Sequence, residues 1–382
     1  MASIAKVANG YRARYRTPAG QSRSRTFKRK TDAERFLVTV EHQKATGGYV
    51  DPSLGRVTVE SWGGRWYATT VNLKPKTRVG YESLLRTRVV PAFGNRPLAT
   101  VTTLDVKEWV AAMSNSGLSP SRVRQAYRVL SAMMGAAVES GYLARTPCAN
   151  VTLPRLPTTE MAFLNAGQIE GLAATVEDRY RALVYVLAYG GLRWGEAAAL
   201  RRGRCQLLRH QLEVRESAAE VNGTLHYGET KTYRARMVVL PAFLTELLAQ
   251  HLERFGGEGP DGLVFTGPGG GPLRNGNFTR RVWRPAVKAA GLPGGLRIHD
   301  LRHTCASLLI SQVASVKAVQ AQLGHSTATL TLDRYGHLFP DEMDRLAEAL
   351  EAVHVGACVS CPCHGHVAAP VSSLAERRTR VG

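Results

Sequence analysis

The sequence predicts a multidomain protein that is mainly α-helical and carries small β elements. Its 382 residues suffice for two or three domains, and 44% of them are hydrophobic, which allows each domain a core. Apolar residues recur at helical spacing through most of the chain, whereas strand-like alternation is confined to short runs. The sequence holds no signal-peptide pattern and no apolar run of about 20 residues, so we expect a cytoplasmic protein that does not enter a membrane.

The balance of charge indicates a polyanionic partner. The formal net charge is +20 at pH 7 and the sequence pI is about 10.1. Such a surplus favours binding to an extended polyanion. Three of the six cysteines, Cys148, Cys205 and Cys305, are isolated in globular sequence, which fits a reducing compartment better than a disulfide framework.

Residues 1–56 form the first predicted unit. Pro18-Ala19-Gly20 predicts a turn between two short strands, and a helix is expected from Asp32 to about Thr46. Residues 11–30 include no acidic residue, and their arginines alternate with aromatic residues and alanine at strand spacing. We expect this basic sheet to lie on DNA, and a solvated basic surface is the alternative. The candidate contacts are Arg12, Arg14, Arg16, Arg23, Arg25 and Lys28.

Residues 57–157 form a second unit, predicted to be a small helical bundle. Val59, Trp62 and Trp66 recur at helical spacing. Further helices are expected over Lys76 to Val90, Thr103 to Ser114 and Pro120 to Ser140. The last of these helices carries Arg122 and Arg124 near its start. These arginines would contact phosphate, although a solvated helix face explains them nearly as well.

Residues 161–353 form the third unit, which mixes helices with short strands. Asn165 and Gln168 form a predicted capping box, and the pattern from Leu172 to Leu200 is helical throughout. Strands are expected over Gln211 to Arg215, Gly223 to Tyr227 and Arg234 to Leu240, with Lys231 at or near a turn. Helices are then expected over Asn277 to Ala290, His299 to Ser311, Val313 to Leu323, Thr327 to Gly336 and Asp341 to Val353.

Polar residues of this unit stand in five short, distinctive contexts. These are Gly191-Leu192-Arg193-Trp194-Gly195-Glu196, Glu229-Thr230-Lys231-Thr232, His299-Asp300-Leu301-Arg302-His303-Thr304, Leu323-Gly324-His325-Ser326 and Asp333-Arg334-Tyr335-Gly336-His337. Arginine is suited to a phosphodiester under attack, because its planar fork binds two phosphate oxygens and stays charged. A tyrosine hydroxyl beside several cations can attack phosphorus, and a lysine can protonate the leaving oxygen.

The order and spacing of these motifs resemble the active site of the tyrosine recombinases, the phage-integrase family. The resemblance implies a catalytic set of Arg193, Lys231, His299, Arg302, His325 and the nucleophile Tyr335. Glu196, three residues after Arg193, would hold the guanidinium in place. The reaction would proceed through a 3′-phosphotyrosyl link and a four-way junction, without a metal or other cofactor.

The resemblance also implies the domain identities and the partners. Residues 1–56 would be an arm-type DNA-binding module, 57–157 a SAM-like core-binding domain and 161–353 the catalytic domain. The partners would be double-stranded attachment sites and three further copies of the chain in a tetramer. An excisionase or a host DNA-bending protein would be accessory partners in a bacterial, nucleoid-associated setting. The alternatives are a non-catalytic DNA-binding regulator on the same scaffold and a relaxing topoisomerase with the same chemistry.

Four features do not follow directly from the resemblance. His299 and His303 share the spacing of a zinc helix, but no third ligand is evident, so we expect His303 to be packed or to support its neighbours. Residues 201–206 are basic and polar where the family has acidic positions, which puts the stability of this loop in doubt. Residues 354–382 are expected to be a disordered tail, with a metal site at Cys358, Cys361, Cys363, His364 and His366 as the alternative. An apolar stripe precedes this tail, at Met343, Leu346 and Leu350.

Overall fold

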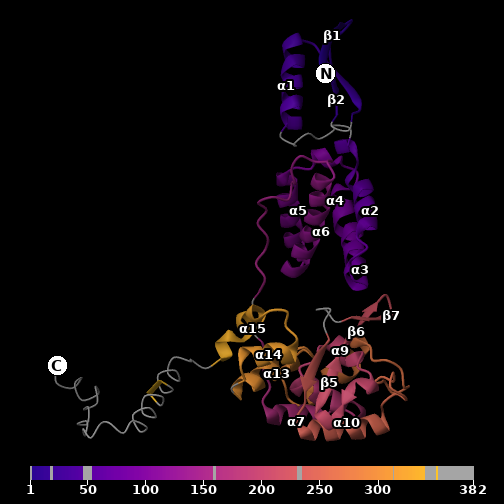
Figure 1. The fold of residues 1–382 in the computed structure, drawn as a ribbon, viewed down its shortest axis with the longest axis vertical. Coiled ribbons are helices and arrows are strands. Elements are labelled where there is room, and N and C mark those ends of the chain that lie inside the picture. The colour runs from indigo at the N-terminus through magenta and orange to yellow at the C-terminus, as the bar shows by residue number, and fades with distance from the viewer. Residues whose placement is uncertain are drawn as a thin grey trace, which may run out of the picture. The chain divides into compact units, whose positions relative to one another are not determined.

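The computed structural model describes residues 2–17, 20–45, 54–157, 161–229, 235–312, 314–339 and 350–351 (Figure 1). By its internal contacts the chain divides into two units, 1–160 with 218–227 and 161–217 with 228–382. Helices dominate both units, and the strands form small sheets. The predicted fold class, mainly α with small β elements, is therefore confirmed. Within the described ranges, no helix is long and apolar enough to span a membrane.

The chain begins with a three-stranded antiparallel sheet covered by one helix. The strands are β1 (Ser3–Val7), β2 (Gly10–Arg16) and β3 (Ser22–Phe27), and the helix is α1 (Lys30–Ala45). Strand β1 was not predicted, because its five residues show no clear alternation of apolar and polar side chains. Ala13 and Tyr15 of β2 are buried with Ala33, Leu37 and Val40 of α1.

The strand register distributes the basic residues over both faces of this sheet. Arg12, Arg14 and Arg16 pair with Thr26, Ser24 and Ser22, so they share the face that does not hold the buried Ala13 and Tyr15. Arg23 and Arg25 pair with Tyr15 and Ala13 on the opposite face. The Arg25 guanidinium lies 5.2 Å and 5.4 Å from the ring centroids of Phe27 and Phe36.

The next segment is a helical bundle with one wide helical turn. Its helices are α2 (Val59–Thr69), α3 (Pro75–Leu84), α4 (Val90–Phe93), α5 (Thr103–Asn115) and α6 (Pro120–Glu139). The predicted helix from Lys76 to Val90 contains a π turn, Leu85–Val89, in which the Val90 N–H donates to Leu85 O five residues back. Pro91 follows directly and cannot donate an α-helical hydrogen bond, which accounts for the change of register.

In the same bundle, the two arginines proposed to contact phosphate already have partners. Arg124 Nη1 donates to Pro154 O at 3.1 Å, and Arg122 Nη1 donates to Gln125 Oε1 at 3.1 Å. Arg124 therefore ties α6 to the segment that ends this unit.

The second unit is built around α8 (Asp178–Tyr189), which is buried along most of its length. The other elements of its first part are α7 (Ala166–Ala174), which begins with the predicted Asn165–Gln168 capping box, and the short α9 (Trp194–Ala198). The prediction of one helical stretch from Leu172 to Leu200 was wrong. The chain turns at Gly191, whose φ of +67° suits glycine, and a Cβ there would lie 2.7 Å from Leu323 Cδ2.

The strands of this unit form one three-stranded sheet, and a hairpin that groups mostly with the first unit lies between two of them in the chain. The sheet has the order β4 (Cys205–Gln206), β5 (Gln211–Val214) and β8 (Arg236–Val239). The hairpin joins β6 (Glu216–Val221) to β7 (Thr224–Glu229) through Asn222 and Gly223, both at positive φ. Strand β6 was not predicted, and the strand expected from Gly223 begins one residue later.

The remaining elements are helical. They are α10 (Ala242–Arg254), which was not predicted, α11 (Asn275–Phe278), α12 (Arg284–Ala289), α13 (Asp300–Ser311), α14 (Val316–Leu323) and α15 (Ala328–Tyr335). A second π turn, Thr279–Trp283, separates α11 from α12, and Pro285 follows it as Pro91 follows the first. The predicted helix from Asp341 to Val353 lies almost wholly outside the described residues, as does the tail from 354.

The basic loop at residues 201–206 is held by hydrogen bonds. Arg204 Nη1 lies 2.7 Å from Glu213 Oε2 of β5, and Arg201 Nη1 donates to Asp261 O at 2.8 Å. Arg202 Nη1 donates to Leu252 O at 3.2 Å. Nearby acceptors therefore bind the arginines of this loop.

Candidate active site

Five of the six candidate catalytic residues stand at the ends of helices in the second unit. Arg193 is the N-cap of α9 rather than part of a longer helix, and His299 is the N-cap of α13. Arg302 lies in the first turn of α13, His325 directly follows the C-cap Gly324 of α14, and Tyr335 is the last residue of α15. Helices α13, α14 and α15 pack together (Figure 1), which brings these ends to one place. Lys231 lies outside the described residues.

A buried carboxylate joins Arg193 to a second arginine. Glu196 Oε1 accepts from Arg193 Nη1 at 2.7 Å, and Glu196 Oε2 accepts from Arg236 Nη2 at 2.7 Å. Only 1% of Glu196 is exposed. Burial alone would raise the pKa of this carboxyl, but Arg236 and Arg193 outweigh it and lower the pKa to about 2. Glu196 is therefore ionised and forms hydrogen bonds with both guanidinium groups.

Three arginines converge on the C-terminal end of α14. Arg236 Nε donates to Gln322 O at 3.2 Å, Arg302 Nη2 to Leu323 O at 2.5 Å, and Arg193 Nη2 approaches Gly324 O at 3.5 Å. The last carbonyls of a helix carry its partial negative charge and need donors from outside the helix. The arginines meet this need and thereby fix the place of His325, the next residue along the chain.

Arg302 is almost completely buried. Its Nη1 donates to Gly191 O at 2.6 Å, which ties the turn before Arg193 to α13. Burial, with a smaller effect from the nearby Arg193, lowers the pKa of Arg302 to about 9, so the guanidinium stays charged at neutral pH. The turn that the positive φ of Gly191 allows is therefore followed directly by a residue of the site, Arg193.

Tyr335 is enclosed by histidines. Its hydroxyl lies 2.8 Å from His303 Nδ1, and its ring is stacked on the ring of His325 with 6.2 Å between centroids and an interplanar angle of 13°. His325 Nδ1 lies 2.8 Å from Thr331 Oγ1 of α15. The His299 ring lies edge-on to that of His303, with 5.0 Å between centroids.

The electrostatic state of this cluster follows from burial and from the arginines. Burial raises the pKa of the Tyr335 hydroxyl, although Arg302 and Arg334 act in the opposite direction. Burial, helped by neighbouring cations, lowers the pKa values of His303 and His325 to about 4. At neutral pH the cluster therefore combines a protonated phenol and neutral imidazoles with charged guanidinium groups.

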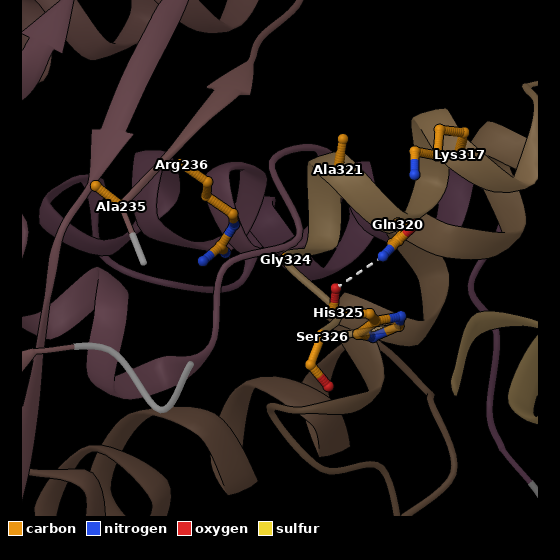
Figure 2. Close-up of a pocket in the computed structure, with 8 residues that line it drawn as sticks. All are labelled: Ala235, Arg236, Lys317, Gln320, Ala321, Gly324, His325 and Ser326. Carbon is orange, nitrogen blue, oxygen red and sulfur yellow. Dashed lines mark hydrogen bonds between the residues drawn. The ribbon is translucent and has the colours of Figure 1, made fainter. Parts of the chain in front are cut away.

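A cavity of about 480 Å³ opens beside His325 (Figure 2). Arg236 lines one side, and Lys317 and Gln320 of α14 line the other. Gln320 Nε2 donates to His325 O at 3.2 Å, which holds the segment after α14 against that helix. The lining therefore presents cationic and hydrogen-bonding groups, which suits an anion such as a phosphodiester.

Comparison with known proteins identifies the family. Residues 162–342 match the model of the phage integrase family, and residues 58–114 match that of the phage integrase N-terminal SAM-like domain. The integrase of Mycobacterium phage D29 is 31% identical over 314 residues, which cover 80% of this chain and 80% of that protein. The chain belongs to the phage integrase family of tyrosine recombinases. The integrase of Mycobacterium phage L5 is 28% identical over 85% of this recombinase and 89% of its own length.

Solved structures share the fold of this recombinase at lower identity. The integrase of transposon Tn1549, in complex with a circular intermediate DNA, has a TM-score of 0.66 and 22% identity over 73% of this chain and 95% of its own. A lambda integrase dimer bound to a COC′ core site has a TM-score of 0.56 and 20% identity, over 72% and 97% of the two chains.

Two residues of the recombinase site were missed or undervalued in the sequence. Arg236 was not a candidate, although it stands at an inward position of a strand, two residues before the buried Val238. A cation in such a position signals a buried ion pair. His303 was expected to be packed or supporting, and it is buried, but its Nδ1 also contacts the Tyr335 hydroxyl.

Among the residues that the structure describes, a zinc site at His299 and His303 finds no third ligand. In the part of the chain that the structure describes, no three His, Cys, Asp or Glu side chains gather as a metal site would require. The cysteines and histidines of residues 358–366 lie outside that part.

Proposed function

We propose that this recombinase is the integrase of a mobile element, which cuts and rejoins DNA through a 3′-phosphotyrosyl link to Tyr335. One observation carries the proposal. The Tyr335 hydroxyl lies among the histidines, and the arginines beside them are held by hydrogen bonds at the end of α14. Cationic donors fixed in advance stabilise the charge that develops on the equatorial oxygens of phosphorus.

Each member of the proposed catalytic set has one role. Arg193 and Arg302 bind the non-bridging oxygens, and His299 and His325 support the same phosphate. Tyr335 Oη attacks phosphorus, and the bond to the 5′ oxygen breaks. Lys231 protonates that oxygen as the general acid, a role that rests on its motif. No metal or nucleotide is needed, because the phosphotyrosyl bond conserves the energy of the phosphodiester.

We assign DNA contacts to the other modules. Residues 1–56 are the arm-type module, with Arg12, Arg14 and Arg16 on one sheet face as its main contacts. Arg23, Arg25 and Lys28 are secondary, as are Arg122 and Arg124 of the core-binding domain at 57–157. The catalytic domain spans 161–353.

Strand exchange requires assembly. Four copies would hold two attachment sites and pass through a four-way junction, with an excisionase or a host DNA-bending protein as accessory partners. A lambda integrase tetramer has been solved on a Holliday junction, and this chain matches it over 85% of its length with a TM-score of 0.56.

The test uses a nicked suicide duplex that carries the core site, incubated without divalent metal. Wild type should form a covalent adduct at the 3′ phosphate on a denaturing gel, and Tyr335→Phe should form none while keeping its DNA affinity. An adduct with the phenylalanine variant would refute the assignment of the nucleophile. A non-catalytic regulator would give no wild-type adduct, and a relaxing topoisomerase would form one but join no strands between two duplexes.

A further inference from the structure

We propose that His303 is a catalytic residue of this recombinase: its Nδ1 accepts the proton of the Tyr335 hydroxyl during cleavage and returns it during rejoining. The inference rests on the proposed function, because it presupposes that Tyr335 is the nucleophile. It adds a proton acceptor to a set that otherwise consists of phosphate-binding groups and a general acid.

The contact between the two side chains is short and enclosed. His303 Nδ1 and Tyr335 Oη are 2.8 Å apart, within the range of a good hydrogen bond. His303 is 4% exposed and Tyr335 is 1% exposed. The first turn of α13 supplies one partner and the last residue of α15 the other, and α14 packs against both helices.

The neighbouring groups are less suited to accept this proton. The His325 ring is nearly parallel to the phenol ring, and its Nδ1 is engaged with Thr331 Oγ1. His299 lies against the His303 ring. Arg302 and Arg334 can only donate, and their charges favour the phenolate that forms once the proton has left.

The protonation states are consistent with this direction of transfer. Burial, with His299 and Arg334 as further causes, lowers the pKa of His303, while Asp300 acts in the opposite direction. His303 is therefore a neutral imidazole with one unprotonated nitrogen, as a proton acceptor must be. An incoming phosphodiester brings negative charge, which favours the imidazolium as the reaction proceeds.

The step balances in both directions. In cleavage, Oη forms a bond to phosphorus, its proton moves to His303 Nδ1, and the 5′ oxygen leaves and is protonated by the general acid. In rejoining, the 5′ hydroxyl gives its proton back to the general acid and attacks the phosphotyrosine, the phenolate leaves, and the His303 imidazolium returns the proton to it.

The first experiment measures single-turnover cleavage of the suicide duplex by the full chain. His303→Asn keeps an acceptor oxygen near the place of Nδ1 but cannot take up a proton, and His303→Leu removes both properties. Both variants should lose about 10²-fold or more in rate, the usual contribution of a general base. A His303→Asn variant that cleaves at the wild-type rate would overturn the proposal and leave His303 as a hydrogen-bond acceptor only.

His210→Asn is the matched control. His210 Nδ1 lies 2.9 Å from Thr245 Oγ1, so it makes the same kind of contact with a hydroxyl away from the site. His210 has a φ of +52°, which asparagine tolerates. This variant should cleave like wild type. A loss equal to that of His303→Asn would show that histidine replacement acts through the fold and would count against the proposal.

The second experiment bypasses the tyrosine. A DNA strand ending in a 3′-p-nitrophenyl phosphate can be joined to a 5′ hydroxyl with release of p-nitrophenolate, which needs no proton to leave. Tyr335→Phe and the double variant Tyr335→Phe, His303→Leu should release it at equal rates. A slower double variant would mean that His303 acts on the phosphate or the fold, against the proposal.

These results distinguish failure of the proposed function from failure of the His303 assignment alone. If wild type forms no covalent adduct, or Tyr335→Phe releases no p-nitrophenolate above the background of the DNA alone, the proposed function fails and the His303 assignment with it. If wild type forms the adduct and His303→Asn cleaves equally well, only the His303 assignment fails.

Discussion

Glu196 and Arg236 form a doubly hydrogen-bonded ion pair in the interior, with Nη2 2.7 Å from Oε2 and Nη1 3.1 Å from Oε1. Arg236 comes from strand β8, and Glu196 lies one turn after Arg193 on α9. The pair therefore joins the strand that follows Lys231 in the chain to the helix that Arg193 caps. Through Glu196, Arg236, which has no assigned contact with DNA, positions Arg193, which we place on the phosphate.

Replacement of Arg236 should lower the stability of the folded protein. Arg236→Ala leaves Glu196 buried with a single partner, and we expect a loss of about 3 kcal/mol in the free energy of unfolding, near the low end for breaking a buried pair. Urea unfolding of the full chain would measure it. Arg204→Ala, which breaks a partly exposed pair with Glu213, should cost less than about 1 kcal/mol. Equal costs for the two variants would contradict the buried role of Arg236.

The histidines around Tyr335 should make stability depend on pH. Their pKa values are about 4 for His303 and His325 in the folded protein, below the ordinary value of 6.5. Between these values the unfolded chain binds more protons, so stability falls as pH drops from about 6.5 towards 4. Thermal unfolding at a series of pH values should show this decline, and His325→Gln should flatten it. An unchanged slope in the variant would exclude His325 as a contributor.

The turn at Gly191 should tolerate no side chain. In Gly191→Ala the new Cβ would meet Leu323 Cδ2 at 2.7 Å and Cys305 Sγ at 2.9 Å, at a φ of +67°. Gly223→Ala is the matched control, because its φ is +79° and nothing lies within 4 Å of the added Cβ. We expect about 1 kcal/mol for the control, from backbone strain, and at least twice that for Gly191→Ala. Similar unfolding free energies would show that the close contacts are relieved without cost.

The two faces of the N-terminal sheet should differ in DNA binding. Alanine at Arg12, Arg14 and Arg16 should flatten the slope of log K against log[salt] on long attachment sites by about 0.9 for each phosphate that is no longer neutralised. Cleavage of a short core duplex should be preserved. Arg25→Ala should flatten the slope less than any of these replacements, because Arg25 lies over Phe27 and Phe36. A flattened slope for Arg25→Ala alone would reverse our assignment of the DNA-binding face.

The role of Lys231 can be separated from mere phosphate binding. If it protonates the leaving oxygen, Lys231→Ala should be badly impaired on a normal phosphodiester and substantially rescued when sulfur replaces the bridging 5′ oxygen, because a thiolate leaves without a proton. Cleavage rates on the two substrates decide the matter. An equal loss on both would remove the general-acid role and leave the family assignment intact.

The sequence by itself determined the features that depend on local patterns. Helical spacing predicted the bundle of residues 57–157, and the identities of Asn165 and Gln168 predicted the capping box. The motifs around Arg193, His299 and Tyr335 predicted the family, because their order and spacing resemble those of the tyrosine recombinases. None of these inferences needed the three-dimensional distances.

Only the tertiary structure decided which side chains meet. The apolar pattern from Leu172 to Leu200 looked like continuous helix, but the chain breaks at Gly191, where a Cβ would meet Leu323 and Cys305, more than 100 residues away in the chain. Arg236 reaches Glu196 through the pairing of β8 with β5, and His303 reaches Tyr335 through the packing of α13 with its neighbours. Local patterns reflect the interactions of a residue with its neighbours in the chain. Strand register and helix packing determine the long-range contacts on which the proposed chemistry depends.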